Sequence, residues 1–599
     1  MVTRRVEVAN NLFASILYLL VSLIFTWPLV LHISTSVIGP FHGDNLEYVW
    51  KIWWVRHAWL DLRISPWLVP HVYWPHGYSL TYGEITPLHT VVMLPVNLLL
   101  GEVCAYNLAI LLSAWLSGWL AYLWLKDLTG GDRCAAFVGG LIFAFCPYRM
   151  ARIAGHLPLI STEGIPLVLW GMERFWRRRR WGDGLLIATG LLVSALSSWY
   201  YAMALALLVP PYWLVRARPW RVWLTRRWFW SGVGLASLVT ICAVGPFALP
   251  YVDVARSGLA RVPLEEADFW SASLADYLLP NWRHPLWGAA VRRALLGNDD
   301  LLPYEFLLSL GYVGSALALF GLRRGRHQAR RAITIWTVAA LVLGLGPSLH
   351  LLPGWPLRLP LPPGWTNRVT AALTWLGEHS LARETFTLNV GESVVVPLPA
   401  LLIRWFMVAG VGMRSWGRFA LFAVLGIAAL AALGLSVVGE QAGSSGWSSW
   451  RHRLVAIGAG LLVLFEFYTG PQSLIRVEPR PVDAWLARQP GEFAIVQMPL
   501  PVALSGPQMF YTRYHGKSII SGYGTYFPIL FEERYPELAG FPDDASIDCL
   551  AQWPARYVLV DRADLPGYPG LADAIAGQPR LKLMTTVESI DVYAIVGDE

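Results

Sequence analysis

The chain has 599 residues, of which 55% are hydrophobic and only 15% are charged. Soluble proteins carry about 25% charged residues, so this composition excludes an ordinary soluble domain. The formal net charge of +7 does not indicate nucleic-acid binding, because the Arg residues cluster in short loops between apolar runs.

The apolar residues form runs of about 17–25, the length at which a helix crosses a bilayer. We therefore predict a polytopic α-helical membrane protein with about eleven transmembrane helices. The first run follows Arg4 and Arg5 and is interpreted as an uncleaved span, because no small-residue cleavage site follows it. The predicted spans are residues 11–32, 105–125, 134–149, 157–175, 183–199, 201–215, 231–251, 305–322, 332–350, 416–438 and 453–470.

Arg-rich loops set the predicted orientation, because positively charged loops stay on the cytoplasmic side. With a cytoplasmic N-terminus, the spans alternate without conflict. This alternation requires residues 87–101 to be a juxtamembrane segment and residues 396–412 to be interfacial or re-entrant. The cytoplasmic loops are then 173–181, 216–227, 323–331 and 450–453, and the outer segments are 33–104, 150–156, 252–304, 351–415 and everything after 470.

The character of the sequence changes after Gly470. The stretch "PVDAWLARQPGEFAIVQMPLP" indicates a short helix, a turn and a strand, and residues 555–561 and 589–596 are further runs of strand length. We predict that residues 1–470 form a transmembrane domain with a large first outer loop, and that residues 471–599 form an extracytoplasmic α/β domain.

The stretch "FHGDNLEYVW" (41–50) places acidic residues just beyond the first span. If a helix begins here, four positions share one face at i, i+3, i+4 and i+7: Asp44, Glu47, Tyr48 and Lys51. One interpretation is a catalytic carboxylate, Asp44, at the membrane surface, with Glu47 helping to set its geometry. The alternative is a capping box, with an ordinary ion pair between Glu47 and Lys51.

A second polar group lies in "PYRMARIAGHLPLISTEGIPL" (147–167), between a span that leads outward and one that returns. A continuous helix would place His156 and Glu163 on one face, about 10 Å apart along its axis. A carboxylate within the membrane is a candidate functional residue, although neighbouring hydroxyls could equally satisfy Glu163. Arg149 and Arg152 lie on the less usual, outer side, where they could bind a lipid phosphate or ordinary headgroups.

A third group, "GMRSWGRF" (412–419), precedes a late span. Arg414 and Arg418 are spaced i,i+4, so a helix would place both on one face. Two guanidinium groups suit a phosphate or pyrophosphate, because each offers forked donors. A solvated or headgroup-binding pair is the alternative.

Weaker signals come from aromatic, acidic and histidine residues. Trp199 and Tyr200 lie at an outer turn, where they could stack on a sugar or belong to an interfacial belt. Glu305 opens a predicted span, as a site residue or as a partner of the helix dipole.

His71, His76 and Glu84 have no standard metal-binding spacing. The five Cys form no Cys-x-x-Cys pair, and no Walker or H-E-x-x-H motif occurs.

The arrangement resembles the GT-C glycosyltransferase superfamily, whose members are polytopic and use polyprenyl-phosphate-linked sugars. It is also similar to bacterial membrane proteins described as YfhO-like or as uncharacterised glycosyltransferases. The motifs that support the resemblance are "GDNLEYVW", "PYRMARIAGHLPLIST" and "RSWGRFAL".

The resemblance implies a role for each group. Asp44 matches the catalytic acidic residue of the first loop, and His156 and Glu163 occupy a second loop where many relatives carry Asp. Arg414 and Arg418 would hold the lipid phosphate of the donor. Because the first loop lacks the Asp-x-Asp of metal-dependent relatives, no essential metal or other cofactor is expected.

The predicted function is transfer of a sugar from a polyprenyl-phosphate donor to a glycan, lipid or protein acceptor at the outer face of the cell membrane. This reaction needs a base that takes the proton of the acceptor hydroxyl and cations that stabilise the departing phosphate. Two alternatives remain, a transporter or flippase for a lipid-linked glycan and a non-catalytic scaffold for envelope assembly. Transporters favour internal repeats and ionisable groups at the midplane, which this sequence does not indicate.

Overall fold

The computed structural model describes residues 2–258, 261–296, 303–325, 327–362, 364–444, 449–500 and 502–596. By contact, the chain divides into two compact units. Unit 1 holds residues 1–30, 110–153 and 158–472, and unit 2 holds residues 31–109, 154–157 and 473–599. The first outer loop thus belongs to the same unit as the C-terminal residues, an association that chain order alone does not give.

Unit 1 is a helical bundle in which small residues allow close packing. Tyr18 of α1 lies against Gly118 of α5 and Gly140 of α6, and its hydroxyl donates to the carbonyl of Phe137 at 2.7 Å. The bundle helices are α1 (Val2–Phe25), α5 (Glu102–Leu128), α6 (Arg133–Ala144), α7 (Pro147–Arg152), α8 (Leu157–Ile160), α9 (Gly164–Arg178), α10 (Asp183–Ser197), α11 (Trp199–Arg216), α12 (Arg221–Leu224), α13 (Arg227–Ser257), α17 (Tyr312–Arg324), α18 (Arg330–Gly344), α21 (Ala420–Ser444) and α22 (Ser449–Phe467).

Within the described residues, four helices are long and apolar enough to cross a membrane, and they fall on four of the predicted spans. They comprise residues 5–25, 102–128, 227–254 and 416–439. The last of these is mostly buried, because α21 packs against α6, α17, α18 and α22. The chain is therefore a membrane protein, and the count of eleven spans stays a prediction.

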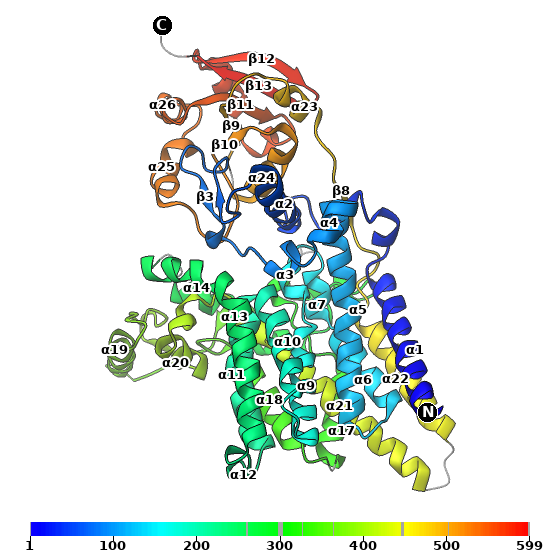
Figure 1. Cartoon of the computed structure of the whole chain (residues 1–599). Coiled ribbons are helices and arrows are strands. Elements are labelled where there is room, and N and C mark those ends of the chain that lie inside the picture. Colours follow the sequence, from blue (N-terminus) through cyan, green and yellow to red (C-terminus); the bar gives the residue numbers. More distant parts are fainter. Residues whose placement is uncertain are drawn as a thin grey trace. The chain divides into compact units, whose positions relative to one another are not determined.

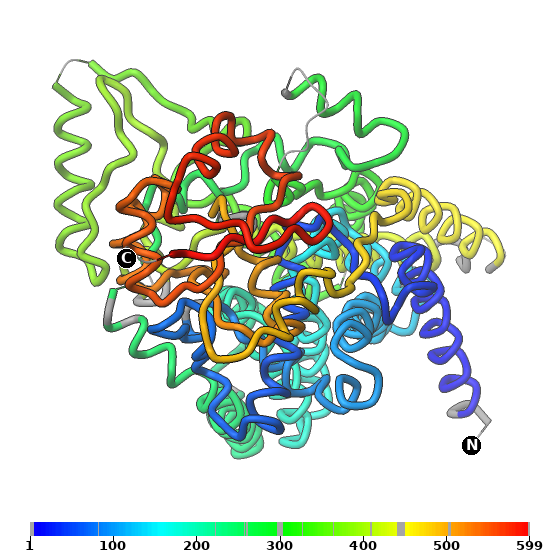
Figure 2. The backbone as a smooth tube through the Cα atoms, turned by 90° about the horizontal axis from the view of Figure 1, so that it is seen from above, coloured from blue at the N-terminus to red at the C-terminus, as the bar shows by residue number. Residues whose placement is uncertain are grey.

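The longer connections of unit 1 carry short elements of their own. A small core forms around Phe386 and Trp405, and α19 lies at the opposite edge of unit 1 from α1 in both views (Figures 1 and 2). The predicted interfacial segment 396–412 contains the short helix α20 and a 3-10 helix over Val408–Gly412. These elements are α14 (Leu264–Phe269), α15 (Leu274–Leu278), α16 (Gly288–Leu296), β4 (His350–Leu352), β5 (Trp355–Pro356), β6 (Arg358–Pro360), α19 (Trp365–Glu378), β7 (Ser393–Val395) and α20 (Pro399–Phe406).

Unit 2 contains a five-stranded mixed sheet with the order β10-β9-β11-β13-β12 (Figure 1). β10, β9 and β11 are parallel, and β13 is antiparallel to β11 and to β12. β9 and β11 are apolar along most of their length, as expected for strands covered on both faces. The elements of this region are α23 (Pro481–Ala487), β9 (Ala494–Met498), α24 (Val502–His515), β10 (Ser518–Ile519), α25 (Ile529–Ala539), α26 (Asp544–Gln552), β11 (Ala555–Asp561), α27 (Leu571–Gly577), β12 (Leu581–Val587) and β13 (Ile590–Ile595).

The first loop joins this region through strand pairing and helix packing. β1 pairs antiparallel with β8, and Trp50 of α2 donates to the hydroxyl of Thr512 on α24 at 3.0 Å. The predicted juxtamembrane segment 87–101 forms two short helices rather than a span. The elements of the loop and its partner strand are β1 (Ser36–Ile38), α2 (Asn45–Arg56), a π-helical turn (His57–Leu62), β2 (Leu68–Val69), β3 (Tyr78–Ser79), α3 (Pro87–Thr90), α4 (Leu94–Leu100) and β8 (Leu474–Arg476).

Candidate functional site

Asp44 stands at the start of α2 but does not cap the helix. Its backbone has helical angles, and its side chain makes no capping hydrogen bond. The helix start is instead fixed by the buried Asn45, which donates to the carbonyl of Ile38 at 3.0 Å and accepts from the amide of Leu46. Asp44 and Glu47 therefore do not form a capping box, and the Asp44 carboxylate is available for other partners.

Two side chains from distant parts of the sequence hold the Asp44 carboxylate within unit 2. The Tyr523 hydroxyl donates to Oδ1 at 2.6 Å, and Nε2 of His156 lies 3.5 Å from Oδ2. The Asp44 side chain is 29% exposed and that of His156 is 24% exposed, so neither side chain of this pair is fully buried. The arrangement presents a carboxylate with a fixed orientation beside an imidazole.

A close backbone approach brings His156 to Asp44. Gly39 has a φ of +114°, and a Cβ at this position would collide with the carbonyl oxygen of Ala154. Glycine is therefore required here, because both the left-handed backbone and the contact exclude a side chain. The amide of Gly39 also donates to the carbonyl of Ser473 at 3.1 Å, which fixes the loop before α2.

Glu47 lies one turn further along α2 and is buried with Lys51. The carboxylate and the ammonium are 2.5 Å apart, and the side chains are 6% and 1% exposed. Burial raises the pKa of Glu47 from 4.5 to about 7, against the opposing effect of Lys51. The predicted i,i+4 pair is thus present, but it is an interior pair and not a solvated one.

The second loop does not form the predicted continuous helix. The chain breaks between α7 and α8 and again before α9, so His156 and Glu163 do not share a helix face. They also belong to different compact units. Pro158 is consistent with the first of these breaks, because proline is found at helix starts and disfavours helical geometry in the residue before it.

Arg149 and Glu163 make contacts within unit 1 that explain both side chains structurally. The guanidinium of Arg149 donates to the backbone carbonyls of Ala144, Ser113 and Ile160. The carboxylate of Glu163 accepts from the Ser113 hydroxyl at 2.7 Å. Glu163 is therefore hydrogen-bonded to a neighbouring hydroxyl, as the structural alternative predicted. Arg149 connects three segments by donating to a backbone carbonyl of each.

Arg152, Glu305 and Arg418 form a buried cluster in unit 1. Glu305 accepts from Arg152 at 2.7 Å, from Arg418 at 2.8 Å and from the Ser415 hydroxyl at 3.0 Å. The Arg152 side chain is fully buried, and that of Arg418 is 15% exposed. Two guanidinium groups share one carboxylate, so the cluster has an excess of positive charge.

The two cations of this cluster retain unused donors. Within the part of the chain that the structure describes, Nε and Nη1 of Arg152 and Nε of Arg418 are buried without a hydrogen-bond acceptor. The Arg418 guanidinium lies 4.1 Å from the ring centre of Tyr200. Buried donors on cations are unfavourable unless an acceptor satisfies them, and an anionic group would do so most strongly.

Arg414 and Arg418 do not form the predicted fork. Residues 416–419 form a 3-10 turn, and Arg414 lies before it, so the two side chains take different partners. Arg414 pairs with Glu266 at 2.8 Å, and both side chains are substantially exposed. The amide of Arg414 donates to the Tyr200 hydroxyl at 3.2 Å, and Trp199 packs edge-on against Tyr251.

Two site residues were not predicted from the sequence. Tyr523 follows the short strand β10 in "SGYGTYF", and Ser415 lies between the two Arg residues already selected. A tyrosine flanked by glycines in a loop is a weak signal, and only long-range pairing brings it to Asp44. Ser415 could have been found, because it lies between the two selected Arg residues and its hydroxyl is a hydrogen-bond donor.

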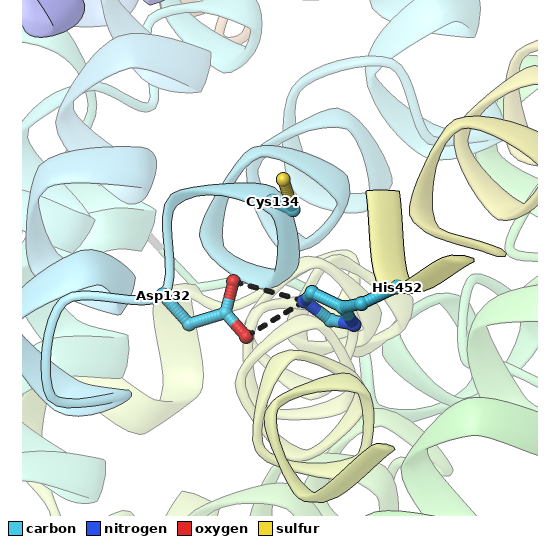
Figure 3. A group of neighbouring side chains, drawn as sticks. All are labelled: Asp132, Cys134 and His452. Carbon is cyan, nitrogen blue, oxygen red and sulfur yellow. Dashed lines mark hydrogen bonds and ion pairs between the residues drawn. The ribbon is translucent and has the colours of Figure 1, made fainter. Parts of the chain in front are cut away.

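Asp132, Cys134 and His452 form a separate group in unit 1 (Figure 3). Asp132 caps α6 by accepting from the amide of Ala135, and its carboxylate lies 3.0 Å from Nε2 of His452. The Cys134 sulfur lies within 4.8 Å of the ligand atoms of this pair, and no hydrogen bond joins it to them in Figure 3. A helix cap and an ion pair account for the arrangement, so we assign it a structural role.

The fold of the chain is that of the GT-C membrane glycosyltransferases. The arabinofuranosyltransferase AftD from Mycobacteria matches with a TM-score of 0.56 and 14% identity over 98% of this chain, which spans 40% of AftD. An oligosaccharyltransferase from Archaeoglobus fulgidus matches with a TM-score of 0.47 and 12% identity, over 98% of this chain and 74% of that one. ArnT from Cupriavidus metallidurans matches with a TM-score of 0.44 and 14% identity over the whole of both chains.

The chain belongs to the family described as Domain of unknown function (DUF6311), whose model matches residues 15–356. No curated protein matches the chain. The match includes both the first loop with Asp44 and the second loop with His156. The closer resemblance to YfhO-like proteins stays a prediction.

Proposed function

We propose that this chain is a membrane glycosyltransferase that moves a sugar from a polyprenyl-phosphate-linked donor to an envelope acceptor at the outer face of the membrane. The proposal rests above all on the Asp44 carboxylate, which Tyr523 holds at 2.6 Å and His156 approaches at 3.5 Å while its side chain stays 29% exposed. A chain of GT-C fold that orients an accessible carboxylate in this way has the base that sugar transfer requires.

In the proposed reaction, Asp44 takes the proton of the acceptor hydroxyl. The acceptor oxygen forms a bond to the anomeric carbon of the sugar, and the bond between that carbon and the phosphate oxygen breaks. The electron pair of the broken bond stays on the departing lipid phosphate. His156 would hold Asp44 in place through Oδ2 or bind the acceptor hydroxyl itself.

Arg152 and Arg418 would bind the lipid phosphate of the donor. Their buried, unused donors would satisfy the oxygens of an anionic group such as a lipid phosphate. Glu305 would keep the two guanidinium groups together when no donor is bound. Arg149, Glu163 and Arg414 have structural or exposed partners, and we give them no part in the chemistry.

The proposed topology has eleven spans and a cytoplasmic N-terminus, with residues 471–599 outside the cell. A polyprenyl phosphate is a membrane lipid, so an enzyme that uses it has to meet it at the bilayer. The acceptor would be a glycan, lipid or protein of the envelope. The proposed chemistry uses the side chains named above and includes no metal or other cofactor.

The test is a turnover assay of the purified protein in lipid nanodiscs. Polyprenyl phosphates that carry different pentoses and hexoses are supplied, and release of polyprenyl phosphate is measured. Asp44→Asn is expected to lower kcat by roughly 10²–10⁴-fold, the contribution of a positioned base. The matched control is Asp61→Asn, which changes an exposed carboxylate of the same loop that pairs with His57.

The same purified protein, reconstituted into lipid vesicles, separates the alternatives. Movement of an intact lipid-linked sugar across vesicle membranes, without release of polyprenyl phosphate, would favour a flippase and contradict the proposal. No turnover and no movement with any donor would favour a scaffold. Equal turnover in the wild type and Asp44→Asn would remove Asp44 from the mechanism.

A further inference from the structure

The residues after β10 contribute a side chain to the candidate catalytic carboxylate. Tyr523 and Asp44 are separated by 479 positions, yet the phenol hydroxyl donates to Oδ1 at 2.6 Å. Both residues belong to unit 2. The distance is that of a charge-assisted hydrogen bond, which is about twice as strong as a neutral one.

Backbone pairing fixes the segment that carries Tyr523. The amide of Ile519 donates to the carbonyl of His71 at 2.8 Å, and the amide of Trp74 donates to the carbonyl of Ile519 at 3.0 Å. The amide of Tyr73 then donates to the carbonyl of Ser521 at 3.4 Å. The first loop and β10 therefore form a local ladder that ends two residues before Tyr523.

Side-chain packing continues this support up to Tyr523 itself. A Cβ at Gly522 would collide with the ring of Tyr73, so the backbone passes directly over that ring. The Tyr523 ring lies beside Gly506 of α24, where a Cβ would meet it at 3.7 Å. The hydroxyl is thus placed by two neighbouring elements, and its position is not that of a freely moving surface side chain.

This placement matters because a carboxylate can rotate about its Cβ–Cγ bond. Asp44 stands at a helix start, where an Asp side chain commonly turns back to cap the first amides. Tyr523 holds Oδ1 and keeps the carboxylate from that orientation, so Oδ2 stays on the side of His156. A base is effective only when it lies within hydrogen-bond reach of the proton that it accepts.

We propose that Tyr523 is a positioning residue for Asp44, so that the residues after β10 take part in catalysis and do not only bind a partner. This inference rests on the proposed glycosyltransferase function. It gives the C-terminal region a defined chemical role, which is to orient the base. Neither the family match nor the order of the chain suggests this role.

The kinetic test compares Tyr523→Phe with the wild type in the turnover assay. The substitution removes only the hydroxyl, so we expect kcat to fall about 10- to 100-fold, because misplacement of a reacting group can cost about 10²-fold. The KM for the donor should stay within about twofold, because Tyr523 acts on the base and not on the phosphate. Tyr526→Phe, in the same loop, is the matched control and should keep the wild-type kcat.

A second measurement tests the contact without turnover. Deuterium uptake of a peptide that covers residues 518–527 is measured in the wild type, Tyr523→Phe, Asp44→Ala and the double variant. If the two side chains hold each other, each single change raises uptake and the double change raises it no further, because coupled sites are not additive. Additive effects would contradict the contact and overturn the proposal.

The two measurements distinguish the possible failures. If the wild type turns over and Tyr523→Phe has the same kcat, the positioning role is overturned and the proposed function is unaffected. A tenfold fall in kcat that Tyr526→Phe reproduces would indicate general damage to the loop, and it too would overturn that role. Absence of wild-type turnover with every donor would overturn the proposed function, and coupled deuterium uptake would then mark a structural contact only.

Discussion

Asp44 and Glu305 are both carboxylates with side-chain partners from distant segments of the chain, but their surroundings differ. Glu305 accepts from two guanidinium groups and a hydroxyl, and its side chain is 14% exposed. Asp44 accepts from a neutral phenol and faces an imidazole, and its side chain is 29% exposed. Two cations surround Glu305, whereas a phenol and an imidazole lie beside Asp44, whose side chain is the more exposed of the two.

The comparison shows why acidic residues near the membrane cannot be assigned from their position alone. A carboxylate that neutralises buried cations is needed for stability, and its removal leaves those cations uncompensated. A partly exposed carboxylate that pairs with no buried cation leaves none uncompensated when it is removed. Stability and activity should therefore separate when each is changed in turn.

The largest effect on stability is expected from Glu305→Gln. The change leaves Arg152 and Arg418 without their shared counter-ion, and breaking a buried pair costs about 3–5 kcal/mol. The Tm of the purified protein should fall by several degrees, while Glu265→Gln, an exposed neighbour of Glu266, should leave it unchanged. An unchanged Tm in Glu305→Gln would mean that solvent or lipid already satisfies the two cations.

A smaller effect, which depends on pH, is expected from Glu47. Its pKa is raised from 4.5 to about 7 by burial, so the native state holds this proton more tightly than the unfolded state. The contribution of Glu47 to stability is therefore complete below pH 4.5 and is lost as pH rises through about 7, by an amount on the order of 1–3 kcal/mol. Thermal unfolding of Glu47→Gln across this range should lack this fall, and an identical pH profile would contradict the assignment.

The smallest effect is expected from Arg414→Gln. Arg414 pairs with Glu266 at 2.8 Å, but the two side chains are 46% and 39% exposed. Such exposed pairs contribute about 0–1 kcal/mol, so Tm and turnover should change little. A large rise in the donor KM would restore Arg414 to the phosphate-binding residues and would weaken the distinction drawn between it and Arg418.

The sequence predicts the membrane class and four of the long spans, because apolar runs of that length are rare outside membrane-spanning helices. It also selects Asp44, His156, Arg152, Arg418 and Glu305. It does not predict their pairing correctly. Arg418 was expected to act beside Arg414 on one helix face, and a 3-10 turn before α21 directs the two side chains to different carboxylates.

The remaining errors have a common physical cause. Helical spacing was assumed through residues 147–167, where the chain in fact breaks twice. Tyr523 was missed because its contact with Asp44 depends on pairing between residues 71–74 and 518–521. Local periodicity contains no information on such distant pairings, so side chains brought together in this way have to be found in the structure.

The most direct test of the proposed mechanism measures donor binding and single-turnover transfer by the same preparations of wild-type protein and Asp44→Asn. If Asp44 is the base, the variant should bind the polyprenyl-phosphate donor with a Kd within about twofold of the wild type, and its transfer rate should fall by roughly 10²–10⁴-fold. Equal transfer rates would contradict the mechanism. So would a parallel loss of binding and transfer, because Asp44 would then serve to hold the substrate.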